Sequence, residues 1–265
     1  MNALETTPAV EATPEAAPAP VKRPTVHLLP ANLGRLAAHA DSRSSTAKFA
    51  LETVDVRFLP DGTYTADATD TKQLVRISGP CVVCEDYPTD RVPALAHAPN
   101  GELGARVSAP AWAKAFAGAK KIKRAASGAV ACVTGKDVTT FAASNLDGDS
   151  LCETSANTQG KFPPVTDILD KTARECGDKR DRATFGALIE AGKIDAAFEY
   201  ATRAPITFAV DPVLLGEILK TAATIQEKGA CRVEVSVSAP TRAILITARG
   251  ANGQNMVSII MPLTS

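Results

Sequence analysis

The amino-acid sequence predicts an α+β fold built from a repeated β-α-β-β-β module. A shared local pattern, a short alternating strand followed by a proline and an amphipathic helix, occurs at residues 25–40, 105–119 and 206–220. Alternating strands follow each of these units. The composition, 45% hydrophobic and 22% charged over 265 residues, is typical of a globular chain. Such a module has one apolar sheet face and one helix, and it buries both by packing against a copy of itself.

Each predicted helix begins at a proline. Pro30, Pro110 and Pro212 stand between the opening strand and the apolar helical pattern of their units. Proline suits the first helical turn because its missing N–H has no partner there in any case. In the third unit, apolar residues at 213, 214, 218 and 219 follow the 3.6-residue period of a helix. We therefore expect three helices, each directly after the opening strand of its unit.

Strands are expected after each helix. They are predicted at residues 49–59 and 63–68 in the first unit, at 129–134 and 138–143 in the second, and at 232–238, 243–248 and 256–261 in the third. Turn residues separate the first two pairs, at Pro60-Asp61-Gly62 and at Gly135-Lys136-Asp137. The predicted sheets are antiparallel, with the helices on one face.

Four segments do not fit the module. Residues 1–24 are rich in alanine, proline, threonine and glutamate and lack the features of a secretory signal, so they are predicted to be a disordered tail. Residues 81–103 form a proline-rich connection, and residues 145–168 are predicted to be an extended connector. Residues 170–203 are too short and too charged for a further module.

The charge balance and the cysteines narrow the class of protein. The 29 basic and 29 acidic residues cancel, which argues against wholesale electrostatic capture by nucleic acid or by a membrane. No run approaches the 18 or more apolar residues that a membrane span needs, so no membrane partner is expected. Six cysteines without an export signal favour free thiols in a reducing compartment. A cytoplasmic protein is expected.

Three stretches together resemble the bacterial replicative sliding clamp, the β subunit of DNA polymerase III. Residues 61–75, Asp-Gly-Thr-Tyr-Thr-Ala-Asp-Ala-Thr-Asp-Thr-Lys-Gln-Leu-Val, are similar to the hairpin of that family that runs into Ala-Thr-Asp-Gly-His-Arg-Leu-Ala. Residues 208–263, ending in Ile-Ile-Met-Pro-Leu, resemble its last half-domain, which ends in Met-Pro-Met-Arg-Leu. The connector at 153–165, with Gly-Lys-Phe-Pro, resembles the link between its middle and final domains.

The resemblance implies a DNA-clamp fold in a shortened form. Residues 25–169 would match the clamp's middle domain with two modules, and residues 170–265 would be a truncated domain, a linker plus one module. Clamps of this family have six modules, whereas three are recognisable here. Thr71, Lys72 and Gln73 stand where the family has Gly, His and Arg, and Asp211-Pro212 replaces a Ser-Tyr pair.

The implied function is that of a DNA-binding processivity factor for replication. The implied partners are duplex DNA, DNA polymerase or repair proteins that carry clamp-binding peptide motifs, and an ATP-dependent clamp loader. A closed ring also implies a homo-oligomer. The implied inner wall carries basic residues that face phosphates without base contacts. The expected DNA-binding residues are Arg35, Arg43, Lys114, Lys120, Lys121, Lys123, Arg124 and Lys220.

Partner proteins would dock in an apolar cleft near the chain end, where a methionine and other apolar side chains accept short peptide motifs. The resemblance places Thr69, Leu74, Val75, Thr241, Ala243, Met261, Pro262 and Leu263 in this cleft.

No catalytic residues, metal or cofactor are predicted, because the sequence contains no nucleophile motif and no phosphate-binding loop. Two alternatives remain. One is a degenerate clamp homologue that binds peptides as a scaffold without encircling DNA. The other is a thiol- or zinc-dependent protein centred on Cys81 and Cys84, although a zinc site needs four ligands and the sequence has no second Cys-x-x-Cys pair.

Overall fold

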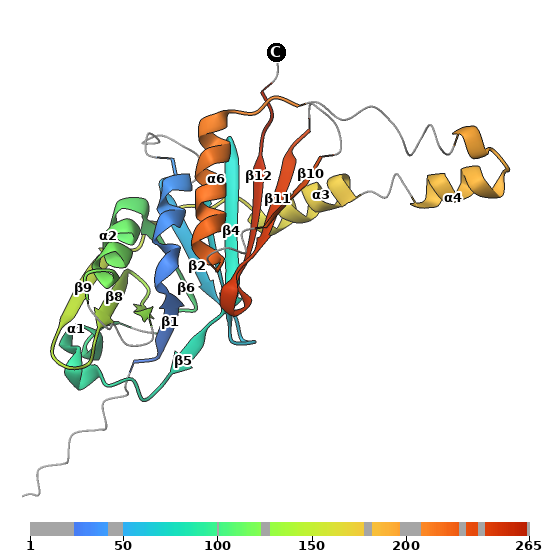
Figure 1. Ribbon diagram of the computed structural model, residues 1–265. Helices are drawn as coiled ribbons and strands as arrows, with labels where there is room; N and C mark the ends of the chain where they lie inside the picture. The colour runs from blue at the N-terminus through green and yellow to red at the C-terminus, as the bar shows by residue number, and fades with distance from the viewer. Residues whose placement is uncertain are drawn as a thin grey trace, which may run out of the picture.

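The computed structural model describes residues 24–41, 50–99, 101–122, 128–177, 182–196, 208–227, 232–237 and 242–263. The predicted tail, residues 1–24, lies outside these ranges except for Pro24. Within the described part of the chain, all strand pairing is antiparallel and forms two sheets with helices packed on them (Figure 1). The predicted α+β class, with its antiparallel sheets and modules, is therefore confirmed.

The larger sheet combines strands from all three units. In sheet order its strands are β10 (Val233–Ser236), β11 (Ile244–Arg249), β12 (Asn255–Ile260), β4 (Gln73–Pro80), β3 (Thr63–Thr69), β2 (Thr53–Phe58) and β6 (Gly104–Ser108). The opening strand of the second unit thus pairs with the first unit, and the last strand of the chain pairs with β4.

The smaller sheet also pairs a strand of the first unit with a strand of the second unit. Its strands, in sheet order, are β5 (Val82–Cys84), β1 (Val26–Pro30), β7 (Ala129–Thr134), β8 (Val138–Ser144) and β9 (Ser150–Ala156). Strand β1 of the first unit pairs with β7 of the second, while β6 of the second pairs with β2 of the first. The two units therefore cannot separate without breaking both sheets.

Three helical segments lie side by side against the sheets: η1 (Ala31–His39), which has 3₁₀ geometry, α2 (Ala109–Ala119) and α6 (Pro212–Ile225) (Figure 1). Each begins within one residue of its expected proline: η1 directly after Pro30, α2 one residue before Pro110, and α6 at Pro212. Asp211 caps α6, because its carboxylate accepts a hydrogen bond from the backbone N–H of Val213 at 2.8 Å.

Further helices connect or cover the sheets. They are η2 (Thr89–Arg91), α1 (Pro93–Ala96), α3 (Val165–Gly177), α4 (Arg182–Glu190) and η4 (Ala251–Gly253). Figure 1 shows α3 on the opposite side of the larger sheet from α6. The strand alternation agrees, since Met256 and Ile260 of β12 join the core beneath α6, whereas Ile259 packs with Leu169 of α3.

The main core fills the space between the helices and the sheets. Trp112 and Phe116 of α2 are fully buried against Phe141 of β8. The indole N–H of Trp112 donates a hydrogen bond to the carbonyl of Leu33 at 3.0 Å, which fixes α2 against η1. Aromatic burial and a satisfied polar group therefore hold the helical layer together.

Two expectations about the elements were wrong. Residues 150–156 form β9 rather than part of an extended connector, because Ser150 to Ala156 pair in full register with β8. The third unit has no opening strand at 208–210, and residues 206 and 207 lie outside the described ranges. The apolar alternation of that segment therefore does not lead to strand pairing in its described part.

Replacing Gly34 with alanine is expected to destabilise the protein. A Cβ at this position would lie 2.7 Å from the Cβ of Phe116, so η1 and α2 would have to move apart. Overpacking of this kind costs about 1–3 kcal/mol of unfolding free energy. Denaturant unfolding measures it. Gly216→Ala in α6 is the control, since no atom lies within 4 Å of its added Cβ. A Gly34→Ala protein as stable as the parent would contradict this packing.

Candidate functional site

The pairing of β4 with β12 brings two distant parts of the sequence to one place. Leu74 lies opposite Ile259 in the register of the two strands. Beyond the last paired residue, the N–H of Met261 donates a hydrogen bond to the carbonyl of Lys72 at 3.0 Å. The turn before β4 and the segment after β12 therefore lie side by side.

A pocket of about 230 Å³ opens at this junction. Its walls come from the β3–β4 turn, from β12 and the residue that follows it, and from the segment that leads into α3. The lining residues are Leu51, Thr69, Thr71, Lys72, Gln73, Leu74, Pro163, Ile168, Ile259 and Met261. Six of these are aliphatic, methionine or proline side chains, and Lys72 is the one charged residue among them.

The floor of the pocket belongs to a small second core on the outer face of the larger sheet. Its buried members are Leu74, Val165, Leu169, Leu245 and Ile259. Two apolar side chains at the rim stay accessible, since Ile168 is 37% exposed and Met261 is 50% exposed. The pocket thus has a buried apolar floor, and at its rim two accessible side chains can change conformation to fit a ligand.

The β3–β4 turn is closed by polar contacts. The carboxylate of Asp70 accepts hydrogen bonds from the N–H groups of Lys72, at 3.0 Å, and Gln73, at 2.9 Å. The hydroxyl of Thr69 donates to the carbonyl of Gln73 at 2.7 Å. Thr71 has a φ of 76°, a left-handed conformation that is unfavourable for a β-branched residue. The surrounding hydrogen bonds hold it there.

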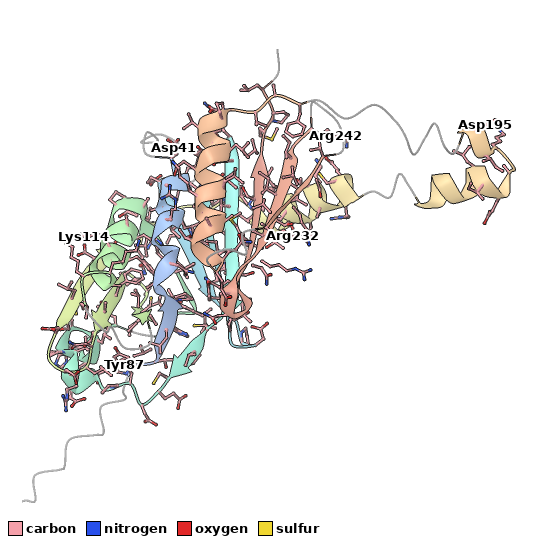
Figure 2. All side chains as sticks on the ribbon, viewed as in Figure 1. Asp41, Tyr87, Lys114, Asp195, Arg232 and Arg242 are labelled. Carbon is pink, nitrogen blue, oxygen red and sulfur yellow. The ribbon has the colours of Figure 1, made fainter. Side chains whose placement is uncertain are left out.

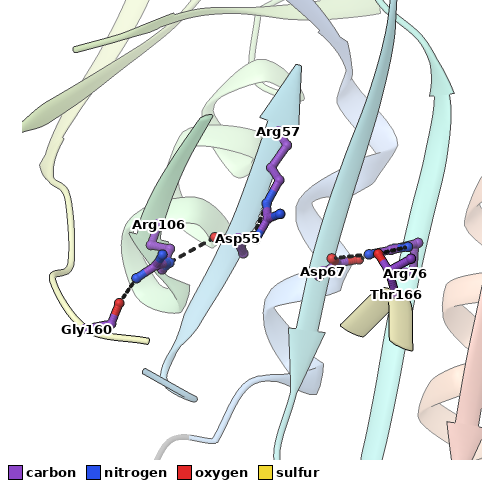
Figure 3. A network of polar contacts seen from close by, with 7 residues as sticks. All are labelled: Asp55, Arg57, Asp67, Arg76, Arg106, Gly160 and Thr166. Carbon is purple, nitrogen blue, oxygen red and sulfur yellow. Dashed lines mark hydrogen bonds and ion pairs between the residues drawn. The ribbon is translucent and has the colours of Figure 1, made fainter. Parts of the chain in front are cut away.

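Polar contacts on the outer sheet face hold the segment that forms the third wall (Figure 3). The guanidinium of Arg76 on β4 donates two hydrogen bonds to the carboxylate of Asp67 on β3, at 2.7 and 2.8 Å, and a third to the hydroxyl of Thr166 at 3.2 Å. Burial raises the pKa of the Asp67 carboxyl, and the bonds from Arg76 oppose that shift. Thr166 stands near the start of α3, whose Ile168 lines the pocket.

A second set of contacts holds the same segment further upstream. Arg106 of β6 donates to the carboxylate of Asp55 at 3.0 Å and also to the carbonyl of Gly160 (Figure 3). The N–H of Ala50 donates to the carbonyl of Lys161 at 2.9 Å. These bonds fix the path of the chain immediately before Pro163, so the pocket wall is anchored on both sides.

Neither a protein-family model nor a curated protein sequence matches this chain. Solved structures do match. The chain is similar to the DNA polymerase sliding clamp of Bacillus subtilis, with a TM-score of 0.55, 14% sequence identity, and coverage of 95% of this chain and 67% of that chain. It is also similar to the polymerase β subunit of Streptococcus pyogenes, with a TM-score of 0.55, 13% identity, and coverage of 97% and 70%. The chain has the sliding-clamp fold.

A further match is the β clamp of Helicobacter pylori bound to a DNA ligase peptide, with a TM-score of 0.56 and 11% identity. It covers 95% of this chain and 69% of that clamp. These matches extend over nearly the whole chain, which spans about two thirds of the length of these clamps.

Three of the expected cleft residues, Thr69, Leu74 and Met261, line the pocket. Val75 does not, because neighbouring residues on a strand point to opposite faces and Val75 is fully buried in the main core. Ala243 packs against the second core without lining the pocket. The other three expected residues also contribute nothing to its described lining: Pro262 is buried, Leu263 is exposed beyond it, and Thr241 lies outside the described residues.

The sequence reasoning did not identify Leu51, Pro163, Ile168 and Ile259 as pocket residues. One signal was present for Ile259, because it stands two positions before Met261 and therefore on the same side of an extended segment. The others come from segments without a strand pattern, and only the tertiary fold brings them to the pocket.

Two of the expected DNA-binding residues form ion pairs with the same carboxylate, one between two helices and one within α6. Glu217 of α6 accepts a hydrogen bond from Arg35 of η1 at 2.7 Å and one from Lys220 at 2.8 Å. The bond from Lys220, together with the nearby charge of Arg35, holds the pKa of Glu217 below its usual value. The two cations are thus partly neutralised where they stand.

The remaining expected cations that the structure describes lie on α2 or directly after it. Lys114 projects from α2 (Figure 2) and pairs with Glu153 of β9 at 2.7 Å. Lys120 and Lys121 are exposed at the end of this helix. Arg43, Lys123 and Arg124 lie outside the described residues.

The cysteine motif lies away from the pocket, on the edge of the smaller sheet. Cys81 is buried, with its sulfur 3.9 Å from Nδ1 of His27, and burial raises its thiol pKa to about 11. Cys84 is half-buried on β5. The described residues contain no group of three or more His, Cys, Asp or Glu side chains placed to hold a metal ion. A thiol of this kind is a poor nucleophile at neutral pH.

Among the residues that the structure describes, no helix has the length and apolar character that crossing a membrane requires.

Acidification from pH 7 to pH 5 is expected to destabilise the fold through His27 and His39. Burial lowers the pKa of both imidazoles, so the unfolded chain takes up protons near its ordinary pKa before the folded chain does. The two histidines therefore contribute their full share to the free energy of unfolding above about pH 6.5. That contribution is lost as the pH falls toward the folded-state pKa, by about 1.4 kcal/mol for each unit by which the folded and unfolded pKa values differ.

Melting temperatures across this pH range measure the effect. Asparagine at both His27 and His39 should flatten the pH dependence. A parent protein whose melting temperature does not fall between pH 7 and pH 5 would disprove the assignment.

Proposed function

We propose that this protein is a sliding-clamp-like processivity factor that tethers DNA polymerase or repair partners through the pocket between β4, β12 and α3. The observation that carries the proposal is the apolar pocket itself, which lies at the joint of two modules in a chain with the sliding-clamp fold. No catalytic role is proposed, and the protein acts by holding other molecules together.

The chemistry of the pocket favours a short peptide with apolar anchors. A volume of about 230 Å³ accommodates one or two large side chains, and the accessible edges of Ile168 and Met261 can adjust to them. Such anchors carry most of the affinity of a peptide in a groove. Lys72 adds a positive charge at the rim, which favours an acidic residue next to the anchors.

The helical layer is the surface proposed to face duplex DNA. It is formed by η1, α2 and α6 and carries Arg35, Lys220 and the exposed lysines at the end of α2. Phosphate contacts of this kind carry no base information and allow sliding. Enclosing DNA requires more modules than one chain supplies, so the proposal includes a homo-oligomer and an ATP-dependent loader that opens it.

A second candidate function is that of a peptide-binding scaffold that does not enclose DNA. The ion pairs of Arg35 and Lys220 with Glu217, and of Lys114 with Glu153, favour it. Cations that already have carboxylate partners gain less from a phosphate, because the carboxylate must be displaced or left unpaired.

Met261→Asp is expected to weaken peptide binding by about tenfold or more, because it places a charge beside the apolar anchor. The probe is a fluorescein-labelled copy of the DNA ligase peptide bound to the Helicobacter pylori clamp, and fluorescence anisotropy measures its dissociation constant. Leu263→Asp is the matched control, since Leu263 is similarly exposed but does not line the pocket. Equal affinities of the parent and Met261→Asp would rule out the pocket as the binding site.

Removal of two charges at the end of α2, by Lys120→Ala and Lys121→Ala together, is expected to weaken DNA binding uniformly across sequences. The slope of log K against log salt should shrink by up to about 1.8, because each neutralised phosphate contributes about 0.9. Lys136→Ala with Lys161→Ala removes the same charge from exposed loops and is the control. An unchanged slope in the α2 variant, or no measurable DNA binding by the parent, would favour the scaffold.

A further inference from the structure

His39 lies between the helical layer and the pocket. It is the last residue of η1 and is fully buried. Its Nδ1 is 3.2 Å from the side-chain oxygen of Gln73 on β4, and its Nε2 is 2.7 Å from the hydroxyl of Thr221 on α6. One side chain therefore joins three elements, one of which forms the pocket rim.

The geometry assigns the proton of the imidazole. The Gln73 side-chain oxygen is only an acceptor, and the amide nitrogen of the same group donates to Asp70 at 3.2 Å. The Nδ1 of His39 must therefore carry a hydrogen and donate it to Gln73. Nε2 then accepts the single hydrogen of the Thr221 hydroxyl at 2.7 Å, a shorter contact than the 3.0 Å that separates the same hydroxyl from the Glu217 carbonyl. The charged groups that face His39 are Glu217, Asp70 and Arg35.

Gln73 is the residue that closes the turn at the pocket. Its backbone N–H and its side-chain amide both donate to Asp70, and its carbonyl accepts from Thr69. The side chain is buried, so its oxygen would have no donor if His39 were replaced by an apolar residue. The amide would then have to turn, and the restraint on the strained Thr71 would weaken.

We propose that His39 is a positioning residue for the pocket, which holds the Asp70–Gln73 turn in its binding conformation through the Nδ1 hydrogen bond to Gln73. The proposal rests on the proposed function, since it concerns the same pocket. His39 does not line the pocket itself, and it acts through Gln73. It extends the site to a residue on the helical layer.

Two substitutions, each of which places an amide near one ring nitrogen of His39, distinguish a positioning role from a role in core packing. In His39→Asn the amide nitrogen falls near the position of Nδ1, so the donor to Gln73 is kept and the contact with Thr221 is lost. In His39→Gln the terminal amide falls near Nε2, so the opposite contact is kept. Both variants fill less of the core than histidine, and their losses of thermal stability should be similar.

The same labelled ligase peptide is the probe, with Met261→Asp as the negative control. His39→Asn should keep the dissociation constant near the parent value, whereas His39→Gln should weaken binding by about five- to tenfold, the cost of one lost hydrogen bond. Gln73→Leu removes the other partner of the His39–Gln73 hydrogen bond. The double variant Gln73→Leu with His39→Gln should therefore bind the peptide no more weakly than Gln73→Leu alone. Equal binding by the asparagine and glutamine variants, whether both strong or both weak, would overturn the proposal.

A measurement that uses no peptide tests the positioning role of His39 separately from the proposed peptide binding. Hydrogen exchange of the Gln73 backbone amide reports the bond to Asp70 that closes the turn. It should stay slow in His39→Asn and become faster in His39→Gln. If the parent protein does not bind the probe, peptide binding fails as a function, and this difference in exchange alone still supports the positioning role. Identical exchange in both variants would reject that role.

Discussion

Strand β12 pairs with β4 from Asn255 opposite Ser78 to Ile260 opposite Gln73. This contact extends the sheet of the first unit into the strands of the third and creates the joint at which the pocket opens. It also divides the side chains of β12 between two environments. Alternate residues join the main core beneath α6 or the smaller core beneath α3, so one strand supports both layers.

The helical layer and the outer face use charge differently. On the helical side, Arg35 and Lys220 share Glu217 at a solvent-accessible position, where such pairs add little stability. On the outer face, the carboxylates of Asp67 and Asp55 are almost completely buried and depend on arginine partners. The outer pairs therefore have the stronger structural role, because removal of one partner leaves a buried charge.

Local chemistry made much of the fold predictable. The prolines at 30, 110 and 212 mark the start of all three packed helices, because proline fits a first turn in any context. The strands predicted at 129–134 and 138–143 are also observed within one residue of those bounds, at 129–134 and 138–144. Strand β9 was missed because most of its side chains are exposed and apolar and polar residues do not alternate along it, so its sequence resembles that of a loop.

The pocket was predictable only in part. The β3–β4 turn and the end of β12 could be chosen through their resemblance to clamp motifs, and both contribute lining residues. Val75 does not line the pocket, because a resemblance over consecutive residues ignores the two faces of a strand. Ile168 and Pro163 could not be found, since their position depends on arginine contacts between residues far apart in the sequence.

The position of the pocket at a strand joint has a thermodynamic consequence. Its walls come from both sides of the β4–β12 contact, so a molecule that fills it touches both halves and binds only while they stay paired. By linkage, occupancy stabilises the joint by RT ln(1 + [L]/Kd), about 2.7 kcal/mol when the free ligand is at a hundred times its dissociation constant. A molecule bound there would act as a removable cross-link, and the mechanical strength of the sheet would then depend on its concentration.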